Sequence, residues 1–179
     1  GIANAFAHSI KHSKTSKLLA VFGRNETRVE SFAEKHQIKA FVDLDKFLNS
    51  DLDAVYIATP HDTHFLYSMA CIRKNIHVLC EKPLTLNASE SMILINAAIK
   101  KKVFLMEAFM YRCHPQTFKI LELVEKYFIG KRVKIKSSFG FTTDVSKEHR
   151  LRNPNLAGGA ILDVGCYPLS MARLISGKL

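Results

Sequence analysis

The chain has 179 residues, enough for one folded core or for one domain and part of another. Hydrophobic residues make up 47% and charged residues 23%, a balance that excludes a disordered chain, and no apolar run approaches the ~18 residues that a membrane span needs. The formal net charge of +10 favours anionic ligands, but the basic residues are scattered and not interleaved with aromatics, so a phosphorylated cofactor or an acidic substrate is favoured over nucleic acid.

The first 108 residues alternate between strand and helix patterns. Residues 2–10 carry apolar and small side chains at helical spacing. Short apolar runs that predict buried strands follow at 18–22, 39–42, 53–58, 76–80 and 103–106. Helical patterns separate these runs at 26–36, 44–48, 63–74 and 87–99. Because the strand patterns are apolar on both faces, we expect a parallel sheet covered by helices on two sides.

Three polar residues stand where helices of this region should begin. Asn25 and Asp43 directly precede helical patterns, and Asn87 is followed by Glu90 at the spacing of a capping box. A side-chain oxygen at such a position accepts a hydrogen bond from a free backbone N–H of the first turn. We therefore expect helix N-caps at all three positions.

The pattern changes after about residue 108. Pro115 predicts the start of a helix that runs to Phe128 and is ended by Gly130. Three further segments predict a half-buried antiparallel strand, a polar loop and, after a glycine pair, a last helix: 132–141, 144–155 and 161–175.

We expect a domain boundary near Phe109. Residues 1–108 form the first domain of this prediction, and residues 109–179 begin a second, α+β domain with a largely antiparallel sheet. The chain begins with Gly1 rather than methionine and ends just after a predicted helix, so we expect it to be a fragment of a longer protein.

The four cysteines predict a reducing compartment. Cys71, Cys80, Cys113 and Cys166 form no Cys-x-x-Cys pair and stand in apolar or helical contexts. Buried free thiols rather than a disulfide framework are expected, which makes the cytoplasm the expected location.

A parallel α/β sheet makes a nucleotide the leading ligand, held by a glycine loop at the start of the first helix. Gly1, Ile2 and Ala3 match the tail of such a loop, with the first strand and the leading glycines absent from the chain. The turn Gly23-Arg24-Asn25 carries an arginine and no carboxylate, which favours the 2′-phosphate of NADP over the 2′-hydroxyl of NAD. The alternative is a solvated turn arginine.

Two strand ends carry further candidate residues. Glu81-Lys82-Pro83 ends a buried run, because proline cannot donate to a sheet ladder. A lysine at the carboxyl end of a strand can take part in proton transfer or polarise a substrate oxygen. The alternative interpretation is that Glu81 and Lys82 form a surface pair in a turn. His61 and His64, with Cys113-His114 further on, show no spacing that supports zinc, so we expect no metal.

Four segments stand in order along the chain: Ala58-Thr59-Pro60 with His64, Glu81-Lys82-Pro83, Met106 to Arg112, and Gly158 to Pro168. Each is a weak signal alone. Together they resemble the glucose–fructose oxidoreductase / inositol dehydrogenase (Gfo/Idh/MocA) family over essentially the whole chain. Within it the chain looks closest to the NADP-dependent branch with dihydrodiol and D-xylose dehydrogenases. The resemblance implies a Rossmann-type first domain, and homo-oligomers formed through the second domain when the protein is full length.

The resemblance also implies roles for individual residues. Lys82 would lie beside the nicotinamide and assist hydride transfer, with a cis Lys82–Pro83 peptide in many members. Asp163 and Tyr167 match the last motif and would share one helix face at i, i+4. Tyr167 would serve as a base only if a cation such as Lys82 stabilised its phenolate. The expected cofactor contacts are Gly1, Ile2, Ala3, Gly23, Arg24, Asn25, Ala58, Thr59, Pro60, His61, His64, Glu81 and Lys82.

Glu107 and Arg112 follow the last strand of the first domain. A structural salt bridge and a contact to the nicotinamide or substrate are both open interpretations of this pair.

The resulting hypothesis is an NADP-dependent oxidoreductase that transfers a hydride to or from a hydroxyl or carbonyl of a sugar or cyclic diol. Lys82 and Tyr167 would handle the proton, and Asp163 would orient the substrate hydroxyl or the lysine. Two alternatives stay open. One is a non-catalytic nucleotide-sensing regulator on the same fold, and the other is a basic nucleic-acid-binding module.

Overall fold

Five short parallel strands form the centre of the first part of the chain in the computed structural model, which describes residues 1–126, 130 and 134–177. In one sheet β1 (Ala20–Phe22) pairs with β2 (Lys39–Phe41). In the other, β4 (His77–Glu81) lies between β3 (Ala54–Ile57) and β5 (Leu105–Ala108). The predicted parallel α/β architecture is therefore confirmed, although the strands form two sheets rather than one continuous sheet.

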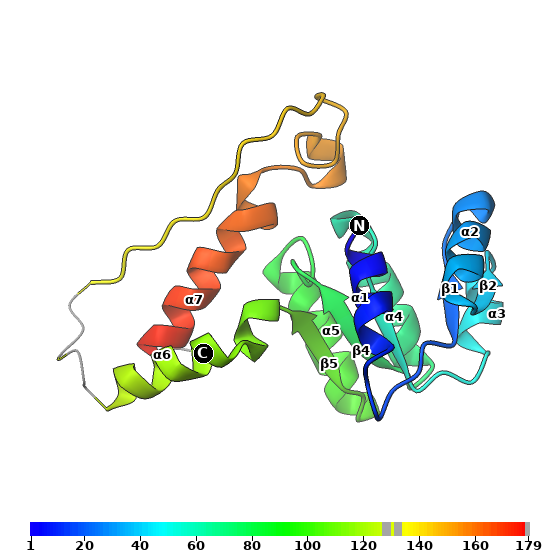
Figure 1. Ribbon diagram of the computed structural model, residues 1–179, viewed down its shortest axis with the longest axis horizontal. Coiled ribbons are helices and arrows are strands. Elements are labelled where there is room, and N and C mark those ends of the chain that lie inside the picture. The colour runs from blue at the N-terminus through cyan, green and yellow to red at the C-terminus, as the bar shows by residue number, and fades with distance from the viewer. Residues whose placement is uncertain (127–129, 131–133, 178–179) are drawn as a thin grey trace.

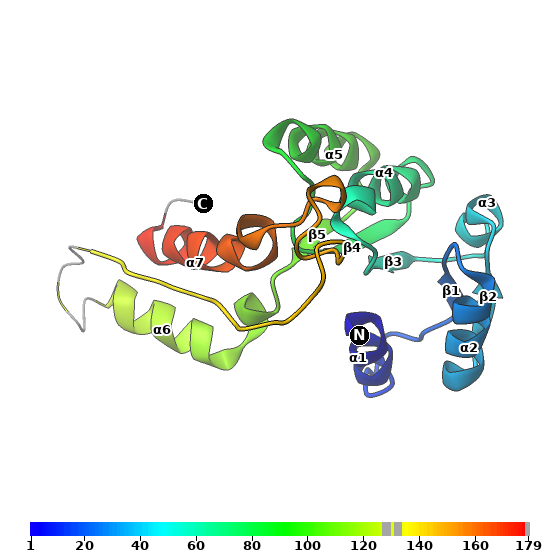
Figure 2. The ribbon, with the colours of Figure 1, turned by 90° about the horizontal axis from the view of Figure 1, so that it is seen from above.

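Helices cover both faces of the three-stranded sheet (Figures 1 and 2). On one side lie α4 (His64–Arg73), preceded by a 3-10 turn η1 (His61–Thr63), and α5 (Ala88–Lys101). On the other side lies α1 (Ile2–Ile10), where Phe6 stacks on Tyr56 of β3 with ring centres 4.0 Å apart. The two-stranded sheet carries α2 (Glu26–His36) and α3 (Leu44–Leu48).

The predicted N-caps are present at all three helices. The side chain of Asn25 accepts the Arg28 N–H at 3.0 Å, and that of Asp43 accepts the Lys46 N–H at 2.9 Å. Asn87 accepts the Glu90 N–H at 2.9 Å. The Glu90 carboxylate returns to the backbone N–H of Leu86 at 3.2 Å, so the second half of the capping box is displaced by one residue.

The main core lies between α4, α5 and the three-stranded sheet. Its most buried members are apolar side chains with at most 3% of their surface exposed: Ile57, Cys71, Ile72, Val78, Cys80 and Leu94. In α5 the buried positions are Leu94 and Ala98, whereas Met92, Ile93 and Ile99 are more than half exposed. The helix therefore presents a narrow apolar stripe to the core and leaves several large apolar side chains outside it.

We predict that Leu94→Ala lowers the free energy of unfolding by about 2–5 kcal/mol, because the change opens a cavity in close-packed surroundings. Leu94 is 0% exposed. Met92→Ala on the same helix, at a side chain that is 53% exposed, should change stability by no more than about 0.5 kcal/mol. Urea unfolding of both variants measures the difference, and equal losses would contradict the assignment of Leu94 to the core.

The second part of the chain is built on two helices near each other in both ribbon views (Figures 1 and 2). After a 3-10 turn η2 (Met110–Cys113), α6 (Pro115–Glu125) starts at the predicted proline. It ends at Glu125 with Lys126 as its C-cap, and the predicted end at Phe128 falls outside the described residues. A short 3-10 turn η3 (Pro154–Leu156), a π-helical turn η4 (Ile161–Gly165) and α7 (Cys166–Ser176) complete the elements.

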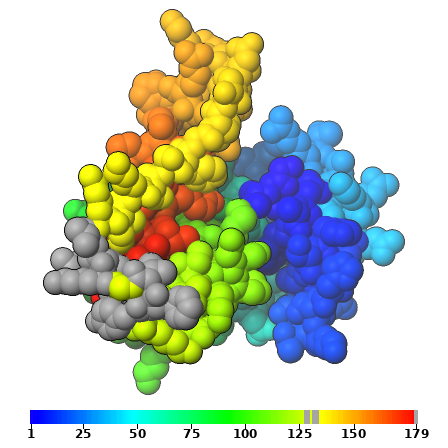
Figure 3. All heavy atoms as spheres, turned by 60° about the vertical axis from the view of Figure 1, so that its left-hand side comes forward, coloured from blue at the N-terminus to red at the C-terminus, as the bar shows by residue number. Residues whose placement is uncertain are grey.

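The strand predicted at 132–141 is not formed in its described part, residues 134–141. This segment runs extended over α7, and Phe139 and Phe141 are about half exposed (Figure 3). Alternating side chains decide which face of a strand is apolar, but a strand also needs a neighbour to complete its hydrogen-bond ladder. Within the described residues no strand pairs with this segment.

All four cysteines are free, but they are not all buried. Cys71 and Cys80 lie in the core, Cys166 is partly buried, and Cys113 is exposed. The prediction of four buried thiols is therefore wrong for Cys113, because it ends the short η2 turn at the surface rather than a core element. None of the helices in the described residues is both long enough and apolar enough to cross a membrane.

Candidate active site

Lys82 meets Asp163 and Tyr167 in the structure, although 81 residues separate Lys82 from Asp163 in the sequence. The Lys82 ammonium donates to the backbone carbonyl of Asp163 and lies 3.2 Å from its carboxylate oxygen Oδ1. It also lies 5.2 Å from the centre of the Tyr167 ring. The Lys82 and Asp163 side chains are only 14% and 13% exposed, so the ion pair is largely shielded from water.

The segment that carries Asp163 is a π-helical turn rather than the start of a regular α-helix. The sequence predicted one helix with Asp163 and Tyr167 at i, i+4, whereas η4 holds Asp163 and α7 begins at Cys166. π-helical turns are rare and occur frequently at functional sites. The turn still directs Asp163 and Tyr167 to the same lysine.

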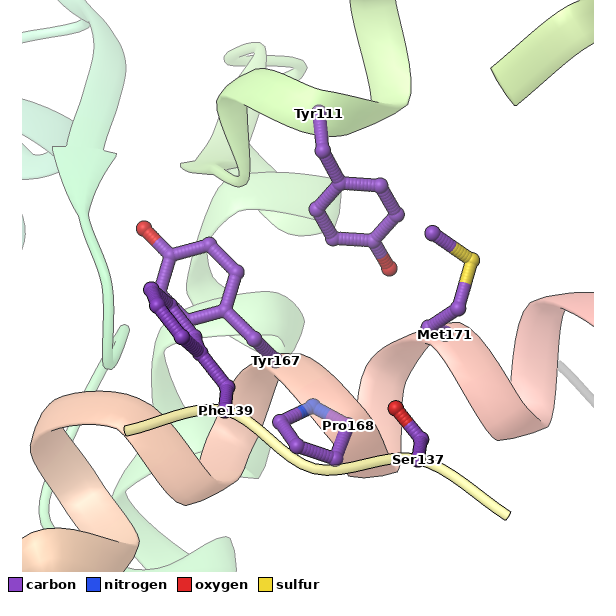
Figure 4. Close-up of a pocket in the computed structure, with 6 residues that line it drawn as sticks. All are labelled: Tyr111, Ser137, Phe139, Tyr167, Pro168 and Met171. Atoms are coloured by element: carbon purple, nitrogen blue, oxygen red, sulfur yellow. The ribbon is translucent and has the colours of Figure 1, made fainter. Parts of the chain in front are cut away.

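Aromatic rings surround Tyr167. Its ring centre is 5.3 Å from Phe109, 5.2 Å from Phe139 and 6.2 Å from Tyr111. Figure 4 shows Tyr111, Phe139 and Tyr167 around a pocket whose other lining residues are Ser137, Pro168 and Met171. With a volume of about 200 Å³ this pocket is smaller than typical small-molecule sites of roughly 300–1,000 Å³, so it suits part of a ligand rather than a dinucleotide.

The surroundings of Tyr167 keep its hydroxyl protonated. Burial raises the pKa of Tyr167 above its usual value, and the nearby Glu81, Cys166 and Asp163 raise it further. As a base, Tyr167 would need a cation that stabilises its phenolate. The structure places Lys82 over the face of the ring and pairs it with Asp163, and burial, Glu81, Cys166 and Asp163 are the influences that shift the pKa of Tyr167. Tyr167 is therefore a hydrogen-bond donor at neutral pH.

Two carboxylates accept hydrogen bonds close to Lys82, one from the backbone and one from a side chain. Glu107 Oε1 accepts the backbone N–H of Leu84 at 2.8 Å, and Glu81 Oε1 accepts the hydroxyl of Tyr56 at 2.5 Å. Burial raises the pKa of Glu107, while the Leu84 N–H and the positive charges of Arg112 and His64 act in the opposite direction. The Lys82–Pro83 peptide is cis, as the resemblance implies.

The turn after β3 carries the next predicted cofactor contacts. Ala58 and Thr59 are partly buried and Pro60 is exposed. The Thr63 hydroxyl lies 2.8 Å from the Thr59 hydroxyl and 2.7 Å from the Pro60 carbonyl. His61 is mostly buried, and this burial lowers its pKa.

His64 differs from its neighbours, because its ring is 0% exposed. Both ring nitrogens contact backbone carbonyls, Nδ1 that of Pro83 at 2.7 Å and Nε2 that of Thr59 at 2.9 Å. In this arrangement both ring nitrogens of His64 are used to link the loop after β3 to the loop after β4.

The remaining predicted cofactor residues make no contact with Lys82, Asp163 or Tyr167 in the described part of the chain. Gly1, Ile2 and Ala3 form the N-terminal end of α1, where the first backbone N–H groups of the helix have no partner within the helix. Gly23 follows β1, and a Cβ there would come within 2.8 Å of the Val29 side chain, so the turn needs glycine.

Arg24 and Asn25 complete the turn after β1. Arg24 is exposed, while the Asn25 side chain is used in capping α2. Among the described residues, neither Arg24 nor Asn25 contacts Lys82.

Arg112 and Arg150 add positive charge near the site. The Nε of Arg112 is buried without a hydrogen-bond partner in the described part of the chain. Among the described residues no ion pair joins Arg112 to Glu107, so the salt-bridge interpretation has no direct support. Arg150 Nη1 lies 3.9 Å from Asp163 Oδ1 and is half exposed. In the sequence Arg150 lies in a stretch that predicts a polar loop, and no spacing signal distinguishes it from the other basic residues.

Gly158 is a further position that sequence spacing did not single out as functional. A Cβ at Gly158 would lie 2.7 Å from the backbone oxygen of Asn153 and 2.8 Å from that of Arg150. The glycine therefore lets the loop that carries Arg150 pack against the start of the Asp163 segment. No group of three or more potential metal ligands occurs in the residues that the structure describes.

Comparison with protein families gives two matches. Residues 1–109 match the oxidoreductase family with an NAD-binding Rossmann fold, GFO/IDH/MocA, and residues 118–179 match the GFO/IDH/MocA C-terminal domain.

Curated relatives and solved structures agree with these matches. The chain is 40% identical over 160 residues to D-xylose 1-dehydrogenase (NADP(+)) 2 of Haloferax volcanii, with 88% of this chain and 49% of that protein covered. It is 33% identical to trans-1,2-dihydrobenzene-1,2-diol dehydrogenase of Xenopus tropicalis, with 89% and 48% covered. A 3-ketoreductase from Actinomadura kijaniata in complex with NADP and TDP-benzene is similar in structure, with a TM-score of 0.84, 28% identity, and 95% and 52% covered. The chain spans about half the length of the curated relatives it matches.

Proposed function

The chain belongs to the GFO/IDH/MocA oxidoreductase family, and on that premise we propose that it is part of an NADP-dependent dehydrogenase acting on a hydroxyl or carbonyl group of a sugar or cyclic diol. The observation that carries the proposal is the shielded Lys82 ammonium held by Asp163 against the Tyr167 ring. The relatives named for xylose and dihydrodiol oxidation support the substrate class.

NADP fits the groups that the chain offers at the ends of its strands. The turn after β1 carries the exposed guanidinium of Arg24 and no carboxylate, which suits a 2′-phosphate. Gly1–Ala3 with the free N–H groups of α1, Gly23 and Asn25, and the Thr59–His61 turn are the other proposed contacts. When bound, NADP supplies the acceptor or donor of the hydride.

Lys82 is the proposed electrostatic catalyst. Its ammonium has three N–H donors, and the carbonyl and carboxylate oxygens of Asp163 take two. The third meets no acceptor among the described residues, and we propose that a substrate oxygen takes it. When a carbonyl is reduced, negative charge develops on that oxygen, and a positioned cation in shielded surroundings stabilises it. Asp163 orients the ammonium.

Tyr167 is the proposed proton donor in the same direction. Its raised pKa keeps the phenol protonated at neutral pH, so it can give its proton to the developing alkoxide. Oxidation of an alcohol needs the same group to be deprotonated beforehand. We therefore expect the oxidation rate to rise with pH and the reduction rate to stay level until pH exceeds the ordinary tyrosine pKa of about 10.

The aromatic pocket beside Tyr167 is the proposed place for the substrate ring. Tyr111 and Phe139 offer flat apolar surfaces to the carbon face of a sugar or cyclic diol, and Ser137 offers a hydroxyl at the edge. The small volume matches one ring rather than an oligosaccharide.

Three further expectations stand as proposals. A boundary near Phe109 separates a cofactor domain from a substrate domain. Homo-oligomers form through the second part, where Ile161, Leu169 and Phe118 expose 78%, 65% and 58% of their surface. The free cysteines fit a cytoplasmic location.

A substrate panel on the full-length protein tests the function. Pentoses, hexoses, inositols and cyclic diols are each offered with NADP and, in parallel, with NAD, and reduced cofactor is followed by absorbance. We expect turnover of at least one sugar or diol with a preference for NADP. Tight NADP binding without turnover of any compound would instead favour a nucleotide-sensing regulator, and salt-sensitive DNA binding without NADP binding would favour a nucleic-acid module.

Arg24→Ala should raise the KM for NADP by about 10- to 100-fold and change the KM for NAD much less, because a hydrogen bond to a charged group contributes roughly 1.5–3 kcal/mol. Arg73→Ala is the matched control, since Arg73 is exposed in the last turn of α4. Initial rates with both cofactors give the ratio. Equal losses for NADP and NAD would remove Arg24 from the 2′-phosphate site.

A further inference from the structure

His64 joins the two loops that follow β3 and β4. Its ring is fully buried at the start of α4, and its nitrogens reach the carbonyl oxygens of Thr59 and Pro83. Thr59 lies in the turn proposed to contact the cofactor. Pro83 follows Lys82 directly, so one side chain connects both parts of the proposed site.

The two contacts fix the number of protons on the ring. A carbonyl oxygen can only accept a hydrogen bond, so each ring nitrogen facing one must carry a proton. A neutral imidazole carries a single N–H, and its other nitrogen would set a lone pair against a carbonyl lone pair. A rotated ring would place C–H groups there, but C–H···O contacts are longer, about 3.3–3.6 Å, than the observed 2.7 and 2.9 Å.

We infer that His64 is an imidazolium whose two N–H groups clamp the Thr59 and Pro83 carbonyls and thereby position Lys82. A buried charge needs compensation. The carboxylate of Glu107 on β5 interacts electrostatically with His64 and also binds the Leu84 N–H in the same loop. The imidazolium and the carboxylate thus hold successive backbone groups of the loop that carries Lys82.

The other titratable groups on the elements around His64 are neutral, cationic or already engaged with another partner. From η1, His61 lies with its ring centre 5.7 Å away, and its pKa is lowered by burial and by His64. From β4, burial raises the pKa of Cys80 to about 12, which keeps the thiol neutral, and Glu81 is bonded to Tyr56. Lys82 itself is paired with Asp163. Glu107 is therefore the proposed counter-ion.

Nitrogen NMR of the full-length protein with ¹⁵N-labelled histidine tests the protonation state directly. We expect both ring nitrogens of His64 to show a directly bonded proton at pH 7.5. The signals are assigned by their loss in His64→Gln or, should that variant not fold, by coupling through the hydrogen bond to a ¹³C-labelled proline carbonyl. A single protonated ring nitrogen at His64 would overturn the inference.

His36 is the internal control for this measurement. It is also buried, but only its Nε2 has a partner, Asn4 Oδ1 at 3.0 Å, while Nδ1 has none in the described residues. Burial lowers the pKa of His36. We expect one protonated nitrogen there, so the same spectrum should distinguish the two histidines.

The positioning role rests on the proposed function and has a separate readout. His64→Gln should lower kcat by about 10²-fold, since a displacement of about 1 Å at a catalytic group has an effect of that size. Its KM for substrate should change little, and His36→Gln should keep the wild-type kcat. An unchanged kcat in His64→Gln would overturn the positioning role. Two protonated nitrogens in a protein that turns over no sugar or diol would uphold the clamp and overturn the proposed function.

Discussion

Lys82→Met is expected to lower kcat by about 10²–10⁴-fold in both directions of the reaction. The substitution keeps the length of the side chain and removes its charge. It leaves Asp163 without its close ion-pair partner, because among the described residues the remaining cation is Arg150, at 3.9 Å. The loss should appear in kcat more than in cofactor affinity, since the ammonium acts on charge that develops only in the transition state.

Steady-state rates and separate measurement of NADP binding check this expectation. Lys101→Met is the matched control, because Lys101 is an exposed residue in the last turn of α5. A Lys82→Met enzyme with wild-type kcat, or one that loses NADP binding and turnover in equal measure, would contradict the role given to the ammonium.

Tyr167→Phe is the second large expected effect, a loss of about 10²-fold or more in carbonyl reduction. The ring contacts with Phe109, Phe139 and Lys82 are preserved in phenylalanine, so the change removes only the hydroxyl. In the wild-type enzyme the pKa of Tyr167 is raised by burial and by nearby Glu81, Cys166 and Asp163, so reduction should not decline through the loss of this proton between pH 6 and 9.

The pH profile separates this role from a packing role. In the oxidation direction the wild-type rate should rise with pH, and the variant should lose that rise. Tyr67→Phe removes a hydroxyl from α4 beside Phe22, away from the site, and should keep the wild-type profile. Retention of the alkaline rise in Tyr167→Phe would assign proton transfer to another group.

Local patterns predicted most of the first part of the fold. The helix at 26–36 begins and ends where its spacing predicts, because Asn25 caps it and Gln37 closes it in a left-handed conformation. The end of the strand near Glu81 was predicted because Pro83 cannot continue a sheet ladder. In the structure β4 ends at Glu81. The last strand was predicted at 103–106 and lies at Leu105–Ala108, a displacement typical of short apolar runs.

Other features depend on distant partners, and the sequence analysis was wrong or silent about them. Residues 134–141 have a clear alternation but no strand partner. Cys113 was expected inside and is exposed. The raised pKa of Tyr167 depends on burial and on the charge of Glu81, which lies on β4, far away in the sequence.

The sequence by itself determined the parallel α/β class, the helix caps and the polar residues at the strand ends, because these depend on side-chain periodicity and on hydrogen bonds within one turn. The tertiary structure alone decided that Lys82 meets Asp163 and Tyr167, and that His64 lies inside between two carbonyl oxygens. Such contacts depend on how separate elements pack, and packing brings together residues that no local rule connects.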